Sequence, residues 1–246
     1  DAAIVRETIR RYQVTAVMHF AAFLSVSESV KAPARYYRNN VRHALALLDT
    51  LIEESVTRIV FSSTAAVYGD PVHSPIREDH PTQPINVYGQ TKLIIEKALT
   101  HYASAYGLCS VSLRYFNAAG ADPSGTIGED HDPEIHLIPK ALAAARSGGT
   151  IEIYGTDYPT RDGTCERDYV HVSDLANAHV LALQRLEKEP LAAAYNLGNG
   201  RGHSVREVIA AAERVTGRAV RQKTTDRRPG DPAFLLASSQ KARTEL

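Results

Sequence analysis

Two residues four positions apart, Tyr88 and Lys92, are the part of this chain whose types and spacing most clearly indicate chemistry. They stand at the start of an apolar-periodic segment that predicts a helix over residues 87–106, closed by Gly107. A spacing of four places both side chains on one face of a helix. A free phenol and a free ammonium both titrate near pH ~10, so neither is a useful base at neutral pH. An ammonium held beside a phenol favours the phenolate, so the pair predicts a general base, Tyr88, and the cation that lowers its pKa, Lys92.

An isolated pair of this kind has a simpler explanation, a half-buried tyrosine beside a solvated lysine. The residues that follow three predicted strands favour the chemical interpretation. The strand 58–64 ends in the hydroxyls Ser62, Ser63 and Thr64, the strand 14–20 runs into two alanines, and the strand 110–116 ends on Asn117. Parallel α/β sheets bind ligands at the carboxyl ends of their strands, so we expect a site there, with Thr64 furthest out. One or two of the hydroxyls are also expected to cap a helix.

The order of elements predicts an α/β fold with a doubly wound parallel sheet. Strands alternate with helices over 2–12, 34–54 and 87–106, which indicates a Rossmann-like domain over residues 1–119. Residues 120–246 are richer in Gly, Asp and Pro loops and predict a smaller α/β domain, with segments that return to the main sheet. Its expected elements are a helix over 136–146, a strand over 151–154, a helix over 175–186, and a helix over 205–216 that opens with a capping box from Ser204 to Glu207.

Composition excludes several functional classes. The chain has 28 Lys+Arg against 28 Asp+Glu, a balance that argues against binding nucleic acid or a membrane surface. Cys109 and Cys165 lie in different segments, so we expect no disulfide, and His19, His136 and His171 lack metal-ligand spacing, so we expect no metal site. No apolar run approaches transmembrane length, and a cytoplasmic protein is the expectation.

Several segments together resemble the extended short-chain dehydrogenase/reductases, and within them the nucleotide-sugar 4-epimerases. The resemblance runs along essentially the whole chain and rests on FAA at 20–22, FSSTAAVYG at 61–69, YGQTK at 88–92, RYFN at 114–117, GTIGED at 125–130, HLIP at 136–139, YGTDYPTRDGT at 154–164, RDYVHV at 167–172, YNLG at 195–198 and RRPGDP at 227–232. The match implies an NAD-dependent isomerase that interconverts UDP-glucose and UDP-galactose, for galactose use or for exopolysaccharide supply. It also implies a homodimer formed through a bundle that includes helices 34–54 and 87–106.

The resemblance assigns roles residue by residue. It implies catalytic roles for Tyr88, Lys92 and Thr64. The residues implied to bind NAD are Phe20, Ala21, Ala22, Phe23, Leu24, Asn39, Thr64, Tyr88, Lys92 and Phe116. Those implied to bind the UDP-sugar are Thr64, Tyr88, Asn117, His136, Leu137, Glu152, Ile153, Tyr154, Arg167, Arg228, Asp231 and Leu235. For each arginine taken singly, a surface ion pair is the alternative. Leu24 departs from the pattern, since some members carry a lysine there.

No Gly-rich strand–turn–helix segment occurs in the chain, although such a segment binds pyrophosphate in folds of this kind. We therefore expect the chain to be a fragment of a longer enzyme. A 4,6-dehydratase is a second possible function, but those enzymes place Asp-Glu after the threonine, where this chain has Ala65 and Ala66. A third possibility is a cofactor-binding regulator without catalysis, which would be expected to have lost Tyr88 or Lys92. Phe234 is the alternative to Leu235 as the residue that borders the sugar pocket.

Overall fold

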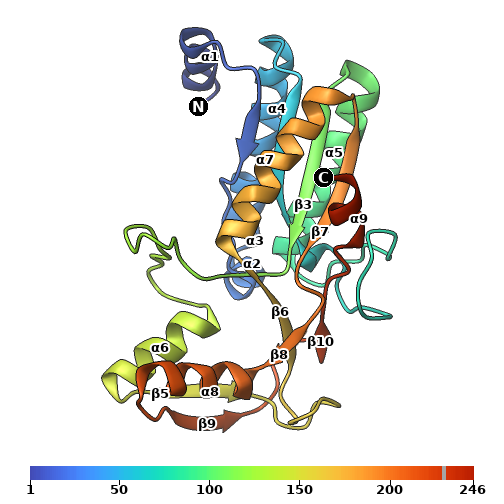
Figure 1. Cartoon of the computed structure of the whole chain (residues 1–246). Helices are drawn as coiled ribbons and strands as arrows, with labels where there is room; N and C mark the ends of the chain where they lie inside the picture. Colours follow the sequence, from blue (N-terminus) through green and yellow to red (C-terminus); the bar gives the residue numbers. More distant parts are fainter. Residues whose placement is uncertain (229–230) are drawn as a thin grey trace.

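The computed structural model describes residues 1–228 and 231–246 and contains a parallel sheet at its centre (Figure 1). The sheet has the strand order β1-β2-β3-β7. Its strands are β1 (Val17–His19), β2 (Arg58–Thr64), β3 (Cys109–Tyr115) and β7 (Ala192–Leu197), and every neighbouring pair is parallel. Because all four strands run the same way, their carboxyl ends meet at one edge of the sheet.

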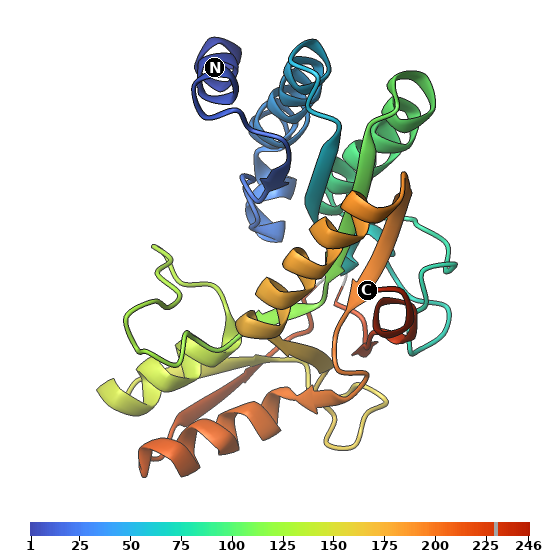
Figure 2. The ribbon, with the colours of Figure 1, turned by 45° about the horizontal axis from the view of Figure 1, so that its top comes forward.

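Helices cover both faces of this sheet, as Figure 2 shows. Alternate residues of β2 point to opposite faces, so Ile59 and Phe61 pack with α4 (His43–Glu53) and α5 (Val87–Tyr106), whereas Val60 packs with α7 (Val172–Lys188). The middle of β2 and β3 is almost wholly buried. In β2 the buried residues begin with the apolar run 59–61, whereas β3 also buries Ser110, Ser112 and Arg114. The fold is therefore the α/β, doubly wound type that the sequence predicts.

Short helices surround the carboxyl edge of β1 and β2. The helices α2 (Val26–Lys31) and α3 (Pro33–Tyr36) follow β1, and a π-helical segment, η1 (Tyr37–Arg42), joins α3 to α4. A 3-10 turn, η2 (Ala65–Val67), follows β2 directly. At the opposite end, α1 (Ala2–Tyr12) packs on α4.

A second group of elements lies below the carboxyl edge (Figure 1). One small sheet has β10 (Phe234–Leu235), β6 (Glu166–His171) and β4 (Asn117–Ala119) in that order, and β8 (Gly202–Ser204) pairs with β6. Another pairs β5 (Thr150–Tyr154) with β9 (Arg221–Thr225) and is covered by α6 (Leu137–Ser147) and α8 (Val205–Thr216). The last helix, α9 (Gln240–Glu245), returns to pack on β7.

Four predicted elements, 2–12, 58–64, 87–106 and 205–216, are confirmed at their predicted bounds, including the capping box of Ser204 and Glu207. The predictions for 110–116 and 136–146 are shifted by one residue.

Three predictions were wrong in extent. The strand predicted over 14–20 spans only Val17–His19, because within the described residues these are the ones that pair with β2. The helix predicted over 34–54 starts at Pro33 and is interrupted by η1. The helix predicted over 175–186 starts earlier, because the His171 side chain caps it by accepting a hydrogen bond from the Ser173 amide.

Both cysteines are free thiols. None of the helices in the described part of the chain is both long and apolar enough to cross a membrane.

Candidate active site

The start of α5 is fixed at the carboxyl edge of the sheet by contacts on three sides. Asn86 caps it by accepting a hydrogen bond from the Gly89 amide, and the Tyr88 amide donates to Ser29 Oγ of α2 at 3.1 Å. At Gly89 the helix touches η2 so closely that a Cβ would lie 2.4 Å from the Ala66 carbonyl oxygen. These contacts place the Tyr88 side chain beside the residues that end β2.

Lys92 reaches the same edge from one turn further along α5. Its Nζ donates a hydrogen bond to the Ser62 carbonyl oxygen at 2.8 Å and lies 5.0 Å from the centre of the Phe61 ring. Burial lowers the pKa of Lys92 to about 8, against the opposing charge of Glu96. Tyr88 is half-buried, as in the simpler interpretation, but Lys92 is only 4% exposed and is therefore not the solvated lysine that this interpretation requires.

The predicted effect of Lys92 on Tyr88 is not seen in this structure. Burial raises the pKa of the Tyr88 phenol, and the hydrogen bond with Thr64, not the ammonium, acts in the opposite direction. The reason is geometric, because Lys92 Nζ is bonded to the Ser62 carbonyl and lies 5.9 Å from the centre of the Tyr88 ring.

The three hydroxyls after β2 have separate roles. Thr64 Oγ1 accepts from the Ala66 amide at 3.1 Å and caps η2, as expected for one of them, and its own proton can be donated toward Tyr88. Ser63 donates to Glu96, a buried carboxylate on α5. Of the three hydroxyls, Thr64 is the one that acts on the pKa of the Tyr88 phenol, which it lowers.

The residues predicted to bind a cofactor follow β1 and line the same edge. Phe20 is 57% exposed. The Asn40 side chain accepts a hydrogen bond from the Phe23 backbone amide at 2.9 Å and donates one to the Phe23 backbone carbonyl at 3.0 Å. Asn39, the predicted ligand, is half-buried and donates to Asn40. Ala21, Ala22 and Leu24 complete this loop, and the cofactor role of these residues stays a prediction.

Sequence reasoning missed Asn40. It is 4% exposed and also donates to Thr91 Oγ1 on α5, which ties the loop after β1 to the Tyr88 helix. Its π-helical position turns the side chain inward, and π segments are frequent at functional sites. Two adjacent asparagines in a helix were the available signal.

Tyr115 and His179 were also missed, and they form a buried pair on the other face of the sheet. His179 Nδ1 lies 2.8 Å from the Leu175 carbonyl, which can only accept, so this nitrogen carries the proton. The Tyr115 phenol therefore donates to His179 Nε2 at 2.6 Å. The Phe20 ring covers His179 with 4.6 Å between ring centres. This contact fixes the start of the loop predicted to bind the cofactor.

Arg167 and Asp231, both predicted to bind the nucleotide, are paired with each other. Arg167 Nη2 lies 3.0 Å from Asp231 Oδ1, and Nη1 donates to the Pro232 carbonyl at 2.8 Å. The Arg167 side chain is only 13% exposed, so this is not the surface ion pair of the alternative interpretation. Pro229 and Gly230, which belong to the same motif, lie outside the described residues.

The strand β5 brings three other predicted residues to Arg228. The guanidinium carbon of Arg228 lies 3.7 Å from the centre of the Tyr154 ring, and the Tyr154 hydroxyl donates to Glu152 at 2.5 Å. The Arg228 guanidinium thus lies on the ring that was predicted to pack on a base, and the base contact stays a prediction. Ile153 is 1% exposed and packs in the core under α6 and α8, so only its backbone can contact a ligand.

Leu235 and Phe116 both pack against a buried cluster that contains Tyr68 and Leu93, the residue after Lys92. Phe234 precedes Leu235 in β10, and successive strand residues point to opposite faces. Leu235 therefore faces this cluster, whereas Phe234 points away from it, and the choice between them as the residue that borders the sugar pocket stays a prediction. Asn117 is nearby on β4 and donates to the Asp168 carbonyl at 2.9 Å.

One loop brings together four side chains whose types could ligate a metal, and the expectation of no metal site stays a prediction. His136, which immediately precedes Leu137 and α6, has its Nδ1 atom in a cluster with Glu129, His131 and Glu134, whose donor atoms all lie within 4.8 Å of one another. The sequence separations concealed this cluster, because the loop folds back on itself. Two imidazoles and two carboxylates could hold Zn²⁺. Each imidazole Nδ1 already faces a carboxylate oxygen, so ion pairing accounts for the arrangement without a metal.

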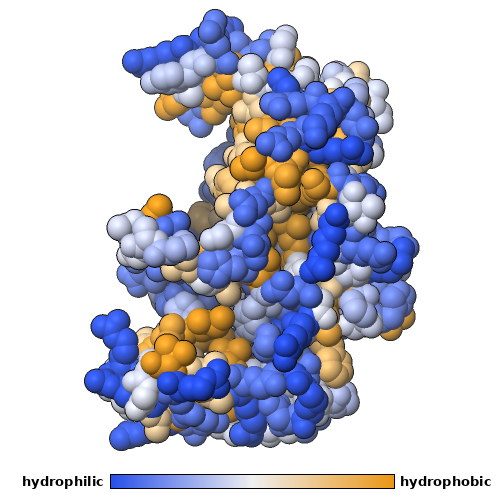
Figure 3. All heavy atoms as spheres, viewed as in Figure 1, coloured by the Kyte–Doolittle hydropathy of each residue, from blue (hydrophilic) through white to orange (hydrophobic). Residues whose placement is uncertain are grey.

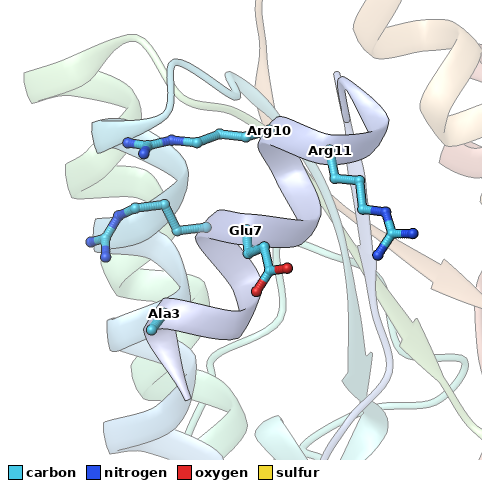
Figure 4. Close-up of a pocket in the computed structure, with 5 residues that line it drawn as sticks. Ala3, Glu7, Arg10 and Arg11 are labelled. Atoms are coloured by element: carbon cyan, nitrogen blue, oxygen red, sulfur yellow. The ribbon is translucent and has the colours of Figure 1, made fainter.

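Two surface features lie away from this edge and gather no reactive groups. A shallow hollow along α1 is lined by residues of that helix only (Figure 4), namely Ala3, Arg6, Glu7, Arg10 and Arg11. Apolar side chains gather over α7 (Figure 3), where Val180 and Leu181 are exposed. Neither feature combines a base with hydroxyl donors, so the candidate site remains at the strand ends.

The fold and the site together define a class of protein, a Rossmann-like enzyme in which a helix-borne Tyr-x-x-x-Lys pair stands at the carboxyl edge of a parallel sheet. The model of the NAD dependent epimerase/dehydratase family matches residues 1–198, and the chain belongs to that family. It is 54% identical over 236 residues to the UDP-glucose 4-epimerase of Halalkalibacterium halodurans, covering 96% of this chain and 71% of that protein.

Solved structures give the same result. The UDP-glucose 4-epimerase of Brucella ovis in complex with NAD superposes with a TM-score of 0.96 at 50% identity, covering 100% of this chain and 76% of that one. The UDP-glucose-4-epimerase from Stenotrophomonas maltophila, with bound NAD and formylated UDP-arabinopyranose, has a TM-score of 0.96 at 41% identity, covering 100% of this chain and 74% of that one.

Proposed function

We propose that this protein is an NAD-dependent isomerase that interconverts UDP-glucose and UDP-galactose by inverting C4 of the sugar. The observation that carries the proposal is the convergence of Tyr88, Thr64 and Lys92 at the carboxyl end of β2. Membership of the epimerase/dehydratase family and the identity with UDP-glucose 4-epimerases support it.

The chemistry requires a base and a hydride acceptor. The C4–H bond of a sugar is not acidic, so simple deprotonation cannot invert the centre. Oxidation to a ketone and reduction from the other face can, and NAD supplies the hydride acceptor when bound. Tyr88 takes the proton of the 4-hydroxyl group, and Thr64 donates a hydrogen bond that orients the sugar oxygen. The Lys92 ammonium, 5.9 Å from the centre of the Tyr88 ring, adds a positive charge to the site. In this role Lys92 also binds a cofactor hydroxyl.

The UDP portion of the substrate keeps the sugar bound while the sugar ring turns over. Arg167 and Arg228 bind the diphosphate, and Asp231 binds a ribose hydroxyl. In the present structure these groups bond to Asp231, Pro232 and Tyr154, so binding of UDP exchanges internal contacts for ligand contacts. The remaining substrate contacts are assigned to Asn117, His136, Leu137, Glu152, Ile153, Tyr154 and Leu235.

The cofactor contacts come from the loop after β1 and from the ends of β2 and β3. We assign them to Phe20, Ala21, Ala22, Phe23, Leu24, Asn39, Thr64, Tyr88, Lys92 and Phe116. Residues 1–119 with the returning strand β7 form the cofactor part, and most of 120–246 forms the UDP-sugar part. The helices α3–α4 and α5 are the surface through which we expect a homodimer.

The test uses the complete reading frame that carries this chain, with UDP-galactose as substrate and NAD present. Conversion to UDP-glucose is expected, and Tyr88→Phe should lower turnover by about 10²–10⁴, the usual contribution of a general base. Tyr102→Phe is the matched control, because Tyr102 lies on the same helix but donates to Asp49 away from the strand ends. An inactive wild-type protein, or full activity of Tyr88→Phe, would remove the proposal.

A further inference from the structure

A buried polar array lies directly behind the Tyr88 region, and the reaction described above assigns it no role. Its centre is Glu96, which is 8% exposed and lies one turn beyond Lys92 on α5. Ser63 of β2 donates a hydrogen bond to Glu96 Oε1. Arg114 of β3 donates to both carboxylate oxygens, from Nε at 3.0 Å and from Nη2 at 2.6 Å. A carboxylate at such a position needs these partners, because burying an unpaired charge is costly.

The array extends across the sheet from Arg114. Its Nη1 donates to the Tyr68 hydroxyl at 2.7 Å, and that hydroxyl donates to Asn196 Oδ1 at 2.7 Å. Tyr68 follows η2, and Asn196 belongs to β7, so a single network links α5 with three strands and with the turn after Thr64. All five residues are buried.

Lys92 and Glu96 hold consecutive residues of β2. Lys92 Nζ binds the carbonyl of Ser62, and Glu96 binds the hydroxyl of Ser63. The next residue is Thr64, whose hydroxyl faces Tyr88. Two adjacent attachments between the helix and the strand therefore fix how Tyr88 and Thr64 stand relative to each other.

Glu96 is also the carboxylate whose charge raises the pKa of Lys92. The titratable groups that face Lys92 are Tyr88 and Glu96 from its own helix and His19 from β1, with the Phe61 ring of β2 over the ammonium. Burial lowers the pKa of Lys92 to about 8, and Glu96 opposes that change. Burial keeps His19 neutral at neutral pH, with a pKa of about 4. Glu96 is therefore the negative charge among these groups at neutral pH.

We propose that Glu96 is a positioning residue for the epimerase reaction, which keeps Lys92 charged and holds Thr64 in place beside Tyr88. This inference rests on the proposed function. The hydrogen bond between Glu96 and Ser63 fixes the position of Thr64, and the negative charge of Glu96 stabilises the charged form of Lys92. These two effects can be measured separately.

The experiment records kcat against pH for UDP-galactose, with NAD saturating, in the protein that carries this chain. Glu96→Gln removes the negative charge, so the charged form of Lys92 is disfavoured. The alkaline limb of the kcat profile should therefore shift to lower pH by about one pH unit or more. Glu96→Asp restores the charge and should return the limb to the wild-type position. Ser63→Ala keeps the charge, so it should lower kcat by about tenfold with an unchanged limb and an unchanged KM.

Glu54→Gln is the matched control. Glu54 also binds an arginine through both oxygens, Arg10 at 2.7 Å for each contact, but it precedes β2 at the opposite end of the sheet. A purely structural role for Glu96 would change melting temperature and leave the limb in place. An unmoved limb in folded Glu96→Gln, or an equal shift in Glu54→Gln, would overturn the proposal. If Glu96→Gln does not fold, wild-type kcat in Ser63→Ala overturns it. Lack of activity in the wild-type protein would instead contradict the proposed function.

Discussion

Several side chains at this site contact partners that the sequence pattern does not indicate. Lys92 stands four residues from Tyr88, yet its ammonium binds the Ser62 carbonyl, and burial raises the pKa of the phenol. The same holds for Arg167, which pairs with Asp231, and for Arg228, which lies on Tyr154. In the described structure, the groups proposed to bind the nucleotide therefore contact one another, and we expect ligand binding to compete with these contacts.

Leu235 should limit the size of the sugar substituent. It packs, like Phe116, against the buried cluster that contains Leu93, so we expect Leu235→Ala to enlarge the pocket. We expect the ratio of kcat/KM for UDP-N-acetylgalactosamine over UDP-galactose to rise about tenfold, since a hydrophobic pocket discriminates small groups by about 1–3 kcal/mol. Phe234→Ala, on the opposite face of β10, is the control and should leave the ratio unchanged. A ratio that rises only in Phe234→Ala would show that the other residue is the gate.

At the scale of elements, the site depends on how closely α5 approaches the turn after β2. Side chains usually separate the backbones of packed elements, but here the backbone of Gly89 lies directly against the backbone of Ala66. The Ser29 hydroxyl and the Asn86 cap hold the same turn of the helix. The interrupted helix α3–η1–α4 adds Asn40, which binds Thr91. The position of Tyr88 thus follows from contacts among four elements.

Gly89→Ala should move the start of α5. The added Cβ would lie 2.4 Å from the Ala66 carbonyl oxygen, so the backbone must shift. We expect a loss of about 1–3 kcal/mol in the free energy of unfolding, as for other overpacked sites, and a fall in kcat. Urea denaturation and the UDP-galactose assay measure the two effects.

Gly128→Ala is the control, since its added Cβ would lie 3.8 Å from the Ala121 Cβ, an ordinary van der Waals contact. Equal stability of the Gly89 and Gly128 variants would contradict the close approach.

At the scale of the whole molecule, one buried carboxylate links distant segments of the chain. Asp168 is fully buried and accepts hydrogen bonds from the amides of Asn199 (2.7 Å), Gly200 (2.8 Å) and Ala237 (3.0 Å). It joins β6, which carries Arg167, to the segments before α8 and after β10. The groups assigned to the nucleotide therefore reach one region although they are far apart in sequence.

His19 makes the stability of the whole molecule sensitive to acid. Its pKa is lowered to about 4 by burial, with Lys92 as a smaller cause, against 6.5 when unfolded. The unfolded chain therefore takes up the proton first, and stability is lost as pH falls from 6.5 toward 4. Between pH 7 and pH 5 this group should account for a loss of about 2 kcal/mol. Urea denaturation of His19→Asn should show a smaller loss than the wild type, whereas the exposed His101→Asn should match the wild type. An equal loss of stability between pH 7 and pH 5 in all three proteins would refute this role of His19.

The sequence by itself determined the class of fold, the bounds of several elements and most of the candidate site. Apolar runs such as 58–64 and the capping signals of 87–106 and 205–216 act locally, so their elements are readable from neighbouring residues. Side-chain types at strand ends likewise indicated Thr64 and Asn117, because a parallel sheet brings its carboxyl ends together. Tyr88 was indicated by its spacing of four from Lys92 on a helix.

Only the tertiary structure decided which of these groups meet. The pairing of Arg167 with Asp231, the four-residue cluster at His136 and the Glu96 array join residues from separate segments, and no local pattern encodes such contacts. The extent of β1 depended on which of its residues pair with β2. The pKa values of Tyr88 and Lys92 depended on burial, which is a property of the packed molecule and not of spacing along a helix.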